Sequence, residues 1–206
     1  RREELARRNR EGALSIAVGE AVTAGGTLRA TLQRCAEALV EHLDAAFARI
    51  WTLNDAEQML ELQASAGMYT HLDGPHGRVP VGKFKIGLIA QEREAHLTNE
   101  VQTDPRVGDK EWARREGMVS FAGYPLMVEE RVVGVLAMFA RRELPEQTLG
   151  SLAAISDAVA STIVRKRAEA ERERLLGELE NERRRLFEAF MQAPVAISVS
   201  EGADHR

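Results

Sequence analysis

The stretch YPLMVEERVVGVLAMFARR, residues 124–142, decides the fold of this chain. Two apolar runs flank the charged corner EER at residues 129–131, a pattern that predicts an antiparallel β-hairpin. A strand with two apolar faces belongs in the middle of a sheet that is covered on both sides. In the second run, both sets of alternate residues are apolar: Val133, Val135, Ala137 and Phe139 on one expected face, and Val132, Leu136 and Met138 on the other.

Pro125 lies near the start of this hairpin and lacks a backbone N–H. We therefore expect it where the strand begins, bulges or has no partner on that side. Upstream, residues 46–53 and 58–65 predict two strands joined by the turn sequence NDAE. The second of these has one polar face, which suits a position at or near an edge. Residues 66–84 are rich in glycine and proline and predict a loop.

The remaining elements complete an α+β order. Three short ones are predicted in chain order: a helix over 86–93, a strand over 95–99, and a helix within 104–117 that has Asp109 as its N-cap. Longer helices are predicted over 1–22, 27–43 and 145–190. Cys35 falls within the apolar stripe of the second long helix, which indicates a core position and not a reactive one.

The helix predicted over 145–190 changes character along its length. Its second half is highly charged, and the spacing of glutamates and arginines allows i, i+3 pairs that keep it solvated. A stripe of Leu176, Leu179, Leu186 and Phe190 runs through these charges. A projecting helix can bury such a stripe only against a second copy, so we expect a parallel two-chain coiled coil, and therefore a homodimer, through the C-terminal helix. A solvated single helix is the alternative.

Composition excludes several classes of partner. The 206-residue chain carries a net charge of -4, so it is a poor match for the phosphates of nucleic acid. No apolar run reaches the ~20 residues that a membrane span needs, and the N-terminal residues lack the apolar segment of a secretory signal. We therefore expect a cytoplasmic protein. The missing first Met and the abrupt end suggest a piece of a longer chain.

The order of elements, together with the motifs IGLIAQ, LTN, DPR, SFAGYPL and GVLAMF, resembles the GAF domain of bacterial signalling proteins. The resemblance covers about residues 23–164 and is strongest over 82–142. It implies an antiparallel sheet of five or six strands between helical layers. The first, second and last helices would cover one face and pair with a partner chain, and the short helices and glycine-rich loop would close a pocket on the other.

The resemblance also implies a domain organisation. Residues 1–22 would form an N-terminal dimer or linker helix, 23–144 the GAF domain and 145–190 a signalling helix. Residues 191–206 resemble the start of a PAS domain. This arrangement is similar to the sensory half of a sensor histidine kinase in a two-component phosphorelay. The alternatives are a GAF domain that serves only as a dimerisation spacer, and the GAF domain of a cyclic-di-GMP enzyme.

The family layout implies pocket walls, any of which could instead be plain core: Phe84, Ile86, Ile89, Trp112, Met118, Phe121 and Tyr124. The ligand, and any cofactor, stays unidentified. The signature of cyclic-nucleotide-binding members does not fit residues 99–145, and Cys35 is misplaced for a bilin. One cysteine is also too few for members that reduce methionine sulfoxide.

The remaining candidate groups favour binding over catalysis. His71, Asp73 and His76 share a loop, where a metal site is the less favoured alternative to exposed polar residues. For His96, a haem ligand is likewise the less favoured alternative to a satisfied or surface histidine. The sequence contains neither a phosphoacceptor histidine box nor a glycine-rich nucleotide loop. We therefore predict a regulatory module that is not itself an enzyme.

Overall fold

The computed structural model describes residues 2–192, with side chains from residue 9 onward. Within this part, the elements are α1 (Arg2–Thr23), α2 (Leu28–Leu43), β1 (Phe47–Asn54), β2 (Met59–Gly67), β3 (Arg78–Pro80), α3 (Phe84–Glu92), β4 (His96–Thr98), α4 (Lys110–Arg115), β5 (Ser120–Val128), β6 (Arg131–Ala140) and α5 (Gln147–Gln192). The predicted α+β class is confirmed. The described strands form one six-stranded antiparallel sheet in the order β3-β2-β1-β6-β5-β4.

Strand β6, the second strand of the hairpin, lies at the centre of the sheet, as its sequence predicts. β6 pairs with β1 on one side and with β5 on the other. Pro125 lies in β5 beyond the three residues that pair with β4, so its missing N–H leaves no ladder bond unmade on that side. The turn consists of Glu129 and Glu130, and Glu129 adopts a positive φ of 55°.

A bulge in this hairpin corrects the faces that were expected for Val132 and Val133. The pairing shifts between Leu126, which lies opposite Gly134, and Met127, which lies opposite Val132. Val133 is the extra residue, so the alternation of faces inverts beyond it. Each of the two valines therefore packs on the face opposite to the one predicted.

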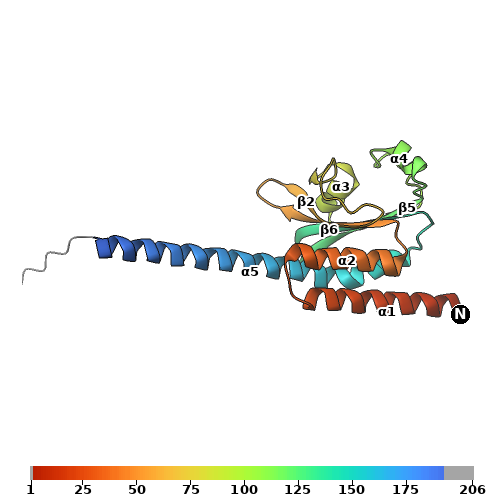
Figure 1. Ribbon diagram of the computed structural model, residues 1–206. Coiled ribbons are helices and arrows are strands. Elements are labelled where there is room, and N and C mark those ends of the chain that lie inside the picture. Colours follow the sequence, from red (N-terminus) through yellow and green to blue (C-terminus); the bar gives the residue numbers. More distant parts are fainter. Residues whose placement is uncertain (1, 193–206) are drawn as a thin grey trace, which may run out of the picture. The chain divides into compact units, whose positions relative to one another are not determined.

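Figure 1 shows α1, α2 and the start of α5 on one face of the sheet and α3 and α4 on the other. A hydrophobic core lies on each face. The helix-side core joins the sheet to α1, α2 and the first part of α5, and its largest members include Leu32, Leu39, Leu136, Leu152 and Ile155. The loop-side core lies under α3, α4 and the connecting loops, and it includes Leu60, Ile89, Met118, Phe121 and Val135. The sheet is thus covered on both faces, which explains why the alternate residues of β6 are all apolar.

The segment predicted as a loop over residues 66–84 contains one strand that the sequence did not reveal. β3 pairs residue for residue with Met59–Glu61 of β2, so β2 lies next to the edge and not at it. A three-residue strand that follows a glycine and ends in a proline carries too little periodicity to be recognised. The pairing with β2, and not the amino-acid composition of the segment, makes β3 a strand.

The described residues fall into two compact units that divide between Arg167 and Ala168. The first includes the start of α5, which the sequence analysis assigned to a separate signalling helix, because Leu152, Ile155 and Val159 are buried in the helix-side core. The predicted PAS segment lies, from residue 193 on, outside the described residues. None of the helices within residues 2–192 combines the length and apolar content that crossing a membrane requires.

Candidate ligand pocket

A cavity of about 240 Å³ lies on the loop side of the sheet. Its floor comes from β1, β5 and β6, and its walls come from the loop that leads to β3, from α3 and from the segment that ends in α4. The volume is somewhat below the ~300–1,000 Å³ of pockets for drug-sized ligands. The space therefore suits a small metabolite.

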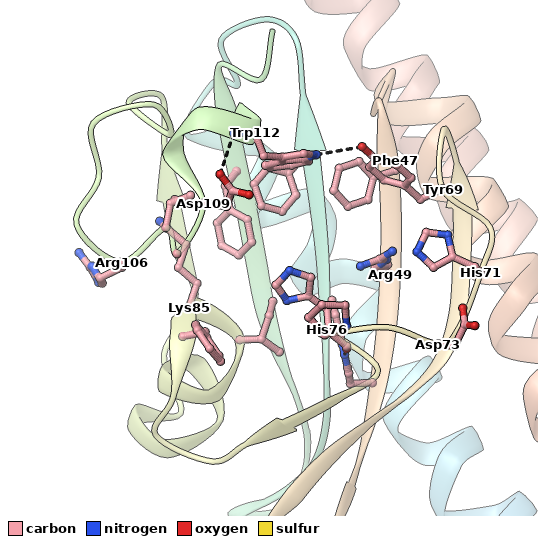
Figure 2. Close-up of a pocket in the computed structure, with 18 residues that line it drawn as sticks. Phe47, Arg49, Tyr69, His71, Asp73, His76, Lys85, Arg106, Asp109 and Trp112 are labelled. Carbon is pink, nitrogen blue, oxygen red and sulfur yellow. Dashed lines mark hydrogen bonds between the residues drawn. The ribbon is translucent and has the colours of Figure 1, made fainter. Parts of the chain in front are cut away.

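An aromatic cluster forms one side of the cavity. Phe47 and Phe139 face each other across β1 and β6, and their rings stack with centroids 4.9 Å apart. Trp112 packs edge-on against Phe139, and its indole N–H donates a hydrogen bond of 2.9 Å to the hydroxyl of Tyr69 (Figure 2). Asp109 caps α4 by accepting from the backbone N–H of Trp112 at 2.7 Å, which positions the indole at the cavity.

Arg49 projects from β1 into this space with only 7% of its surface exposed. Its Nε donates to Ser65 Oγ at 3.1 Å, and its guanidinium carbon lies 5.5 Å from the Phe47 ring centroid and 5.7 Å from that of Tyr69. Within residues 9–192, no carboxylate lies at ion-pair distance from it. Desolvation lowers the pKa of Arg49, although Tyr69 opposes that shift. Arg49 is thus a buried cation whose remaining donors face the cavity.

Ser65 links Arg49 to the opposite layer of the domain. Its hydroxyl donates to the backbone carbonyl of Tyr69 at 2.6 Å. Its backbone carbonyl and N–H both bind the side-chain amide of Gln33 on α2, at 3.0 and 3.2 Å. Ser65 lies beyond the residues of β2 that pair with β3, so Gln33 satisfies a strand edge that would otherwise be open.

Lys85 of α3 also lies at the cavity, but its charge is neutralised. Its Nζ is 2.6 Å from Asp104 Oδ2 and 4.8 Å from the centroid of Phe121. Burial would raise the pKa of Asp104, but hydrogen bonds from Lys85 and from the backbone N–H of Arg106, with the charges of both residues, hold it at about 2. The Arg106 side chain is 48% exposed and lies 3.8 Å from the same carboxylate.

The histidines of the glycine-rich loop line the cavity, which the sequence analysis did not foresee. Both His71 and His76 are exposed overall, and Trp51 Nε1 fixes the loop by donating to the His76 carbonyl at 2.9 Å. Desolvation of the His76 imidazole lowers its pKa, the charge of Arg49 lowers it further, and Asp109 opposes this shift. His76 is therefore neutral near pH 7.

The other histidine and cysteine candidates lie elsewhere. His96 lies beside Asp104, behind the cavity wall, and desolvation followed by the charges of Lys85 and Arg106 lowers its pKa. Cys35 is buried in the helix-side core, where desolvation raises the pKa of its thiol to about 12. Among the residues that the structure describes, no three His, Cys, Asp or Glu side chains cluster as metal ligands would.

The structure separates the seven pocket residues proposed from the sequence. Those at the cavity are Phe84, Ile86, Trp112 and Phe121. Ile89 and Met118 lie in the loop-side core, and Tyr124 packs against the helix-side core. Tyr124 lies three residues after Phe121 in the same strand, so the two side chains point to opposite faces and Tyr124 is not a pocket wall.

Sequence reasoning missed the polar centre of the site. Arg49 is the one charged residue in the predicted strand AFARIWTL, between apolar neighbours, and that is the signal that could have found it. Tyr69 and the loop histidines carry no comparable signal, because their approach to Trp112 and Arg49 depends on how the loop folds over the sheet.

Comparisons with known proteins agree with this architecture. The GAF domain model GAF_2 matches residues 26–164. The GAF domain of an Acinetobacter phosphoenolpyruvate-protein phosphotransferase superimposes with a TM-score of 0.67 at 18% identity, covering 78% of this chain and 97% of that one. A methyl-accepting chemotaxis protein, residues 122 to 287, gives 0.56 at 22% identity, covering 74% and 96%.

An enzyme is also among the similar structures. The free methionine-R-sulfoxide reductase of Neisseria meningitidis, solved in complex with its substrate, has a TM-score of 0.63 at 16% identity, covering 79% of this chain and 91% of that one. No curated protein matches the chain at a significant level. Because the family model spans the sheet, the loop-side core and the pocket, the chain belongs to the GAF domain family.

Proposed function

We propose that this chain is the sensory module of a bacterial signal-transduction protein. A small ligand enters the pocket, changes how the sheet packs on the helix-side core, and so changes the state of α5 in a cytoplasmic homodimer. The observation that carries this proposal is that the same strand lines the pocket with one face and packs in the helix-side core with the other. Phe47 and Arg49 of β1 face the pocket, whereas Ala48 and Ile50 between and after them pack in the helix-side core.

Two polar contacts support a mechanical connection between the layers. The Gln33 amide joins α2 to Ser65, which holds Arg49. Asn99, which follows β4, donates to the carbonyl of Leu144 at 3.0 Å and accepts from its N–H at 2.8 Å, just before α5 begins. A coupling free energy of ~1–3 kcal/mol between pocket and helix would change an output about 5- to 150-fold.

A homodimer would give the second half of α5 something to pack against. Leu176, Leu179 and Leu186 are 50–66% exposed. Arg174 pairs with Glu171 at 2.7 Å and with Glu178 at 2.5 Å, so charged pairs accompany the apolar stripe. Leucines with this spacing and exposure suit a coiled coil.

For the parent protein we propose a sensor histidine kinase of a two-component phosphorelay, with catalysis in other domains. The similar fold of a chemotaxis protein and the GAF domain of a phosphotransferase support a signalling role, while a cyclic-di-GMP enzyme is the alternative parent. We propose that the module binds its ligand without transforming it. Its single cysteine lies across the sheet from the pocket. Trp112 and Phe121 line the cavity without filling it, which favours a sensor over an unliganded spacer.

The test combines ligand binding with hydrogen exchange in α5. A panel of amino acids, carboxylic acids, amides and nucleosides is screened by thermal shift, and exchange is measured over residues 147–167 with and without each hit. We expect at least one hit to alter exchange there. Trp112→Ala should weaken the effect, and Tyr124→Phe, on the other face, should preserve it. A monomer that responds to no panel member would contradict the proposal.

A further inference from the structure

We infer that the pocket takes a small monoanion, a carboxylate with an apolar or aromatic body, bound through the guanidinium of Arg49. This inference rests on the proposed sensory function and names the ligand class of the same site. It starts from the burial of Arg49, because a cation that is 93% withdrawn from solvent normally has a charged partner. Within residues 9–192, the structure supplies a hydroxyl and two aromatic rings but no carboxylate.

The neighbouring cations show that this lack of a partner is specific to Arg49. Lys85, equally buried, has Asp104 at 2.6 Å, and Arg106 shares that carboxylate at 3.8 Å. A second uncompensated buried cation is therefore not present among the described pocket residues. One unpaired buried cation favours a ligand with one negative charge. A phosphate dianion would need a second unpaired cation to balance its second charge.

The placement of the guanidinium favours a planar anion. Within residues 9–192, Nε is the one Arg49 nitrogen that donates a hydrogen bond, to Ser65. The terminal nitrogens are left to form the paired donors that match the two oxygens of a carboxylate. Figure 2 shows the Arg49 guanidinium directed into the same space as the imidazoles of His71 and His76. The neutral imidazole of His76 can donate or accept one further hydrogen bond without changing the charge balance.

The rest of the cavity favours an apolar body on the ligand. Phe47, Trp112, Phe121 and Phe139 form a continuous set of ring contacts beside Arg49. The carboxylates that line the cavity do not neutralise Arg49. Asp109 accepts a hydrogen bond from the backbone N–H of Trp112. Asp73 is exposed at the rim of the cavity, beyond ion-pair distance from Arg49. A carboxylate therefore fits at Arg49, with its body against the rings.

The experiment compares small monocarboxylates, aromatic, aliphatic and α-amino, with their primary amides, by calorimetry on the 206-residue protein. An amide keeps the shape and removes the charge. We expect the best carboxylate to bind at least ~10-fold more tightly than its amide, since a hydrogen bond to a charged group is worth that much. Phenyl phosphate, which brings the second charge, should bind more weakly than benzoate or phenylacetate.

Arg49→Met is the decisive variant, and Arg106→Met is its matched control at the same cavity. We expect Arg49→Met to reduce the preference for carboxylate to below ~3-fold, and Arg106→Met to retain it. Without ligand, Arg49→Met should raise Tm by about 2 °C or more, because an unpaired buried charge is removed. This stability readout does not depend on finding the natural ligand.

The outcomes separate this inference from the proposed function. Equal binding of carboxylates and amides, or a preference that survives in Arg49→Met, would overturn the anion assignment and leave a sensory pocket standing. Tighter binding of phenyl phosphate than of benzoate and phenylacetate would overturn the assignment of a monoanionic ligand. A lower Tm for ligand-free Arg49→Met would also count against it, since Arg49 would then be stabilising the empty protein. If neither carboxylates nor amides bind, the anion assignment fails, and the sensory proposal fails with it only when the nucleosides of the wider panel also give no response.

Discussion

At the scale of single residues, two buried cations of one pocket differ in a way that assigns them different roles. Lys85 and Asp104 are each less than a tenth exposed, and they neutralise each other. Arg49 is equally buried and forms no such pair within the described chain. Removing one member of a buried ion pair is costly because the other is left unpaired. Lys85 therefore belongs to the framework, and Arg49 is available for a ligand.

The Lys85–Asp104 pair makes stability depend on pH. The pKa of Asp104 is about 2 in the folded protein and has an ordinary value of 3.8. Protonation therefore favours the unfolded chain, so the contribution of about 2 kcal/mol is present above pH ~4 and is lost as the pH falls towards 2. Urea unfolding between pH 2 and 7 should show a smaller acid loss in Asp104→Asn than in wild type. Asp157→Asn, on the exposed side of α5, should follow wild type, and parallel curves for all three proteins would refute the role of the pair.

At the scale of elements, the central hairpin depends on a glycine that its hydrophobic pattern does not explain. Gly134 lies opposite Thr52 of β1 and opposite Leu126 of β5. A Cβ at this position would collide with the backbone carbonyl oxygen of Trp51. The bulge that exchanges Val132 and Val133 lies directly beside it. At this position the backbones of β6 and β1 approach so closely that only a glycine, which has no Cβ, fits.

Gly134→Ala should lower the free energy of unfolding by about 2–3 kcal/mol, because the added methyl forces β1 and β6 apart. Gly150→Ala is the matched substitution in α5, where no atom lies within 4 Å of the new Cβ, and it should stabilise by roughly 0.5–1 kcal/mol. Chemical denaturation of both variants checks the contrast. Similar changes in the two proteins would mean that the backbone contact at Trp51 does not constrain the sheet.

At the scale of the whole molecule, α5 has two environments. Its first part contributes Leu152, Ile155 and Val159 to the helix-side core, whereas Leu179 and Leu186 are 66% and 63% exposed. One helix thus begins inside the compact unit and continues as an apolar stripe that its own unit does not bury. Helices of this kind are stabilised by packing on a partner more than by propensity.

We expect the protein to be a dimer that Leu179→Asp with Leu186→Asp weakens at least tenfold, because two apolar contacts are replaced by repelling charges. Asn181→Asp introduces the same residue off the stripe and should leave the dimer intact. Sedimentation equilibrium measures the association, with circular dichroism to confirm that the helix persists. A wild-type monomer, or equal weakening by Asn181→Asp, would contradict the coiled coil.

The amino-acid sequence was enough to place the second strand of the hairpin of residues 124–142 at the centre of the sheet, to order the helices and strands and to indicate the family, because periodicity and turn residues act between near neighbours. Tertiary structure alone placed β3, inverted Val132 and Val133, moved Tyr124 out of the pocket and left Arg49 facing it without a carboxylate. These outcomes depend on contacts between residues far apart in the chain. A local pattern does not specify which of its side chains such contacts will bury or pair.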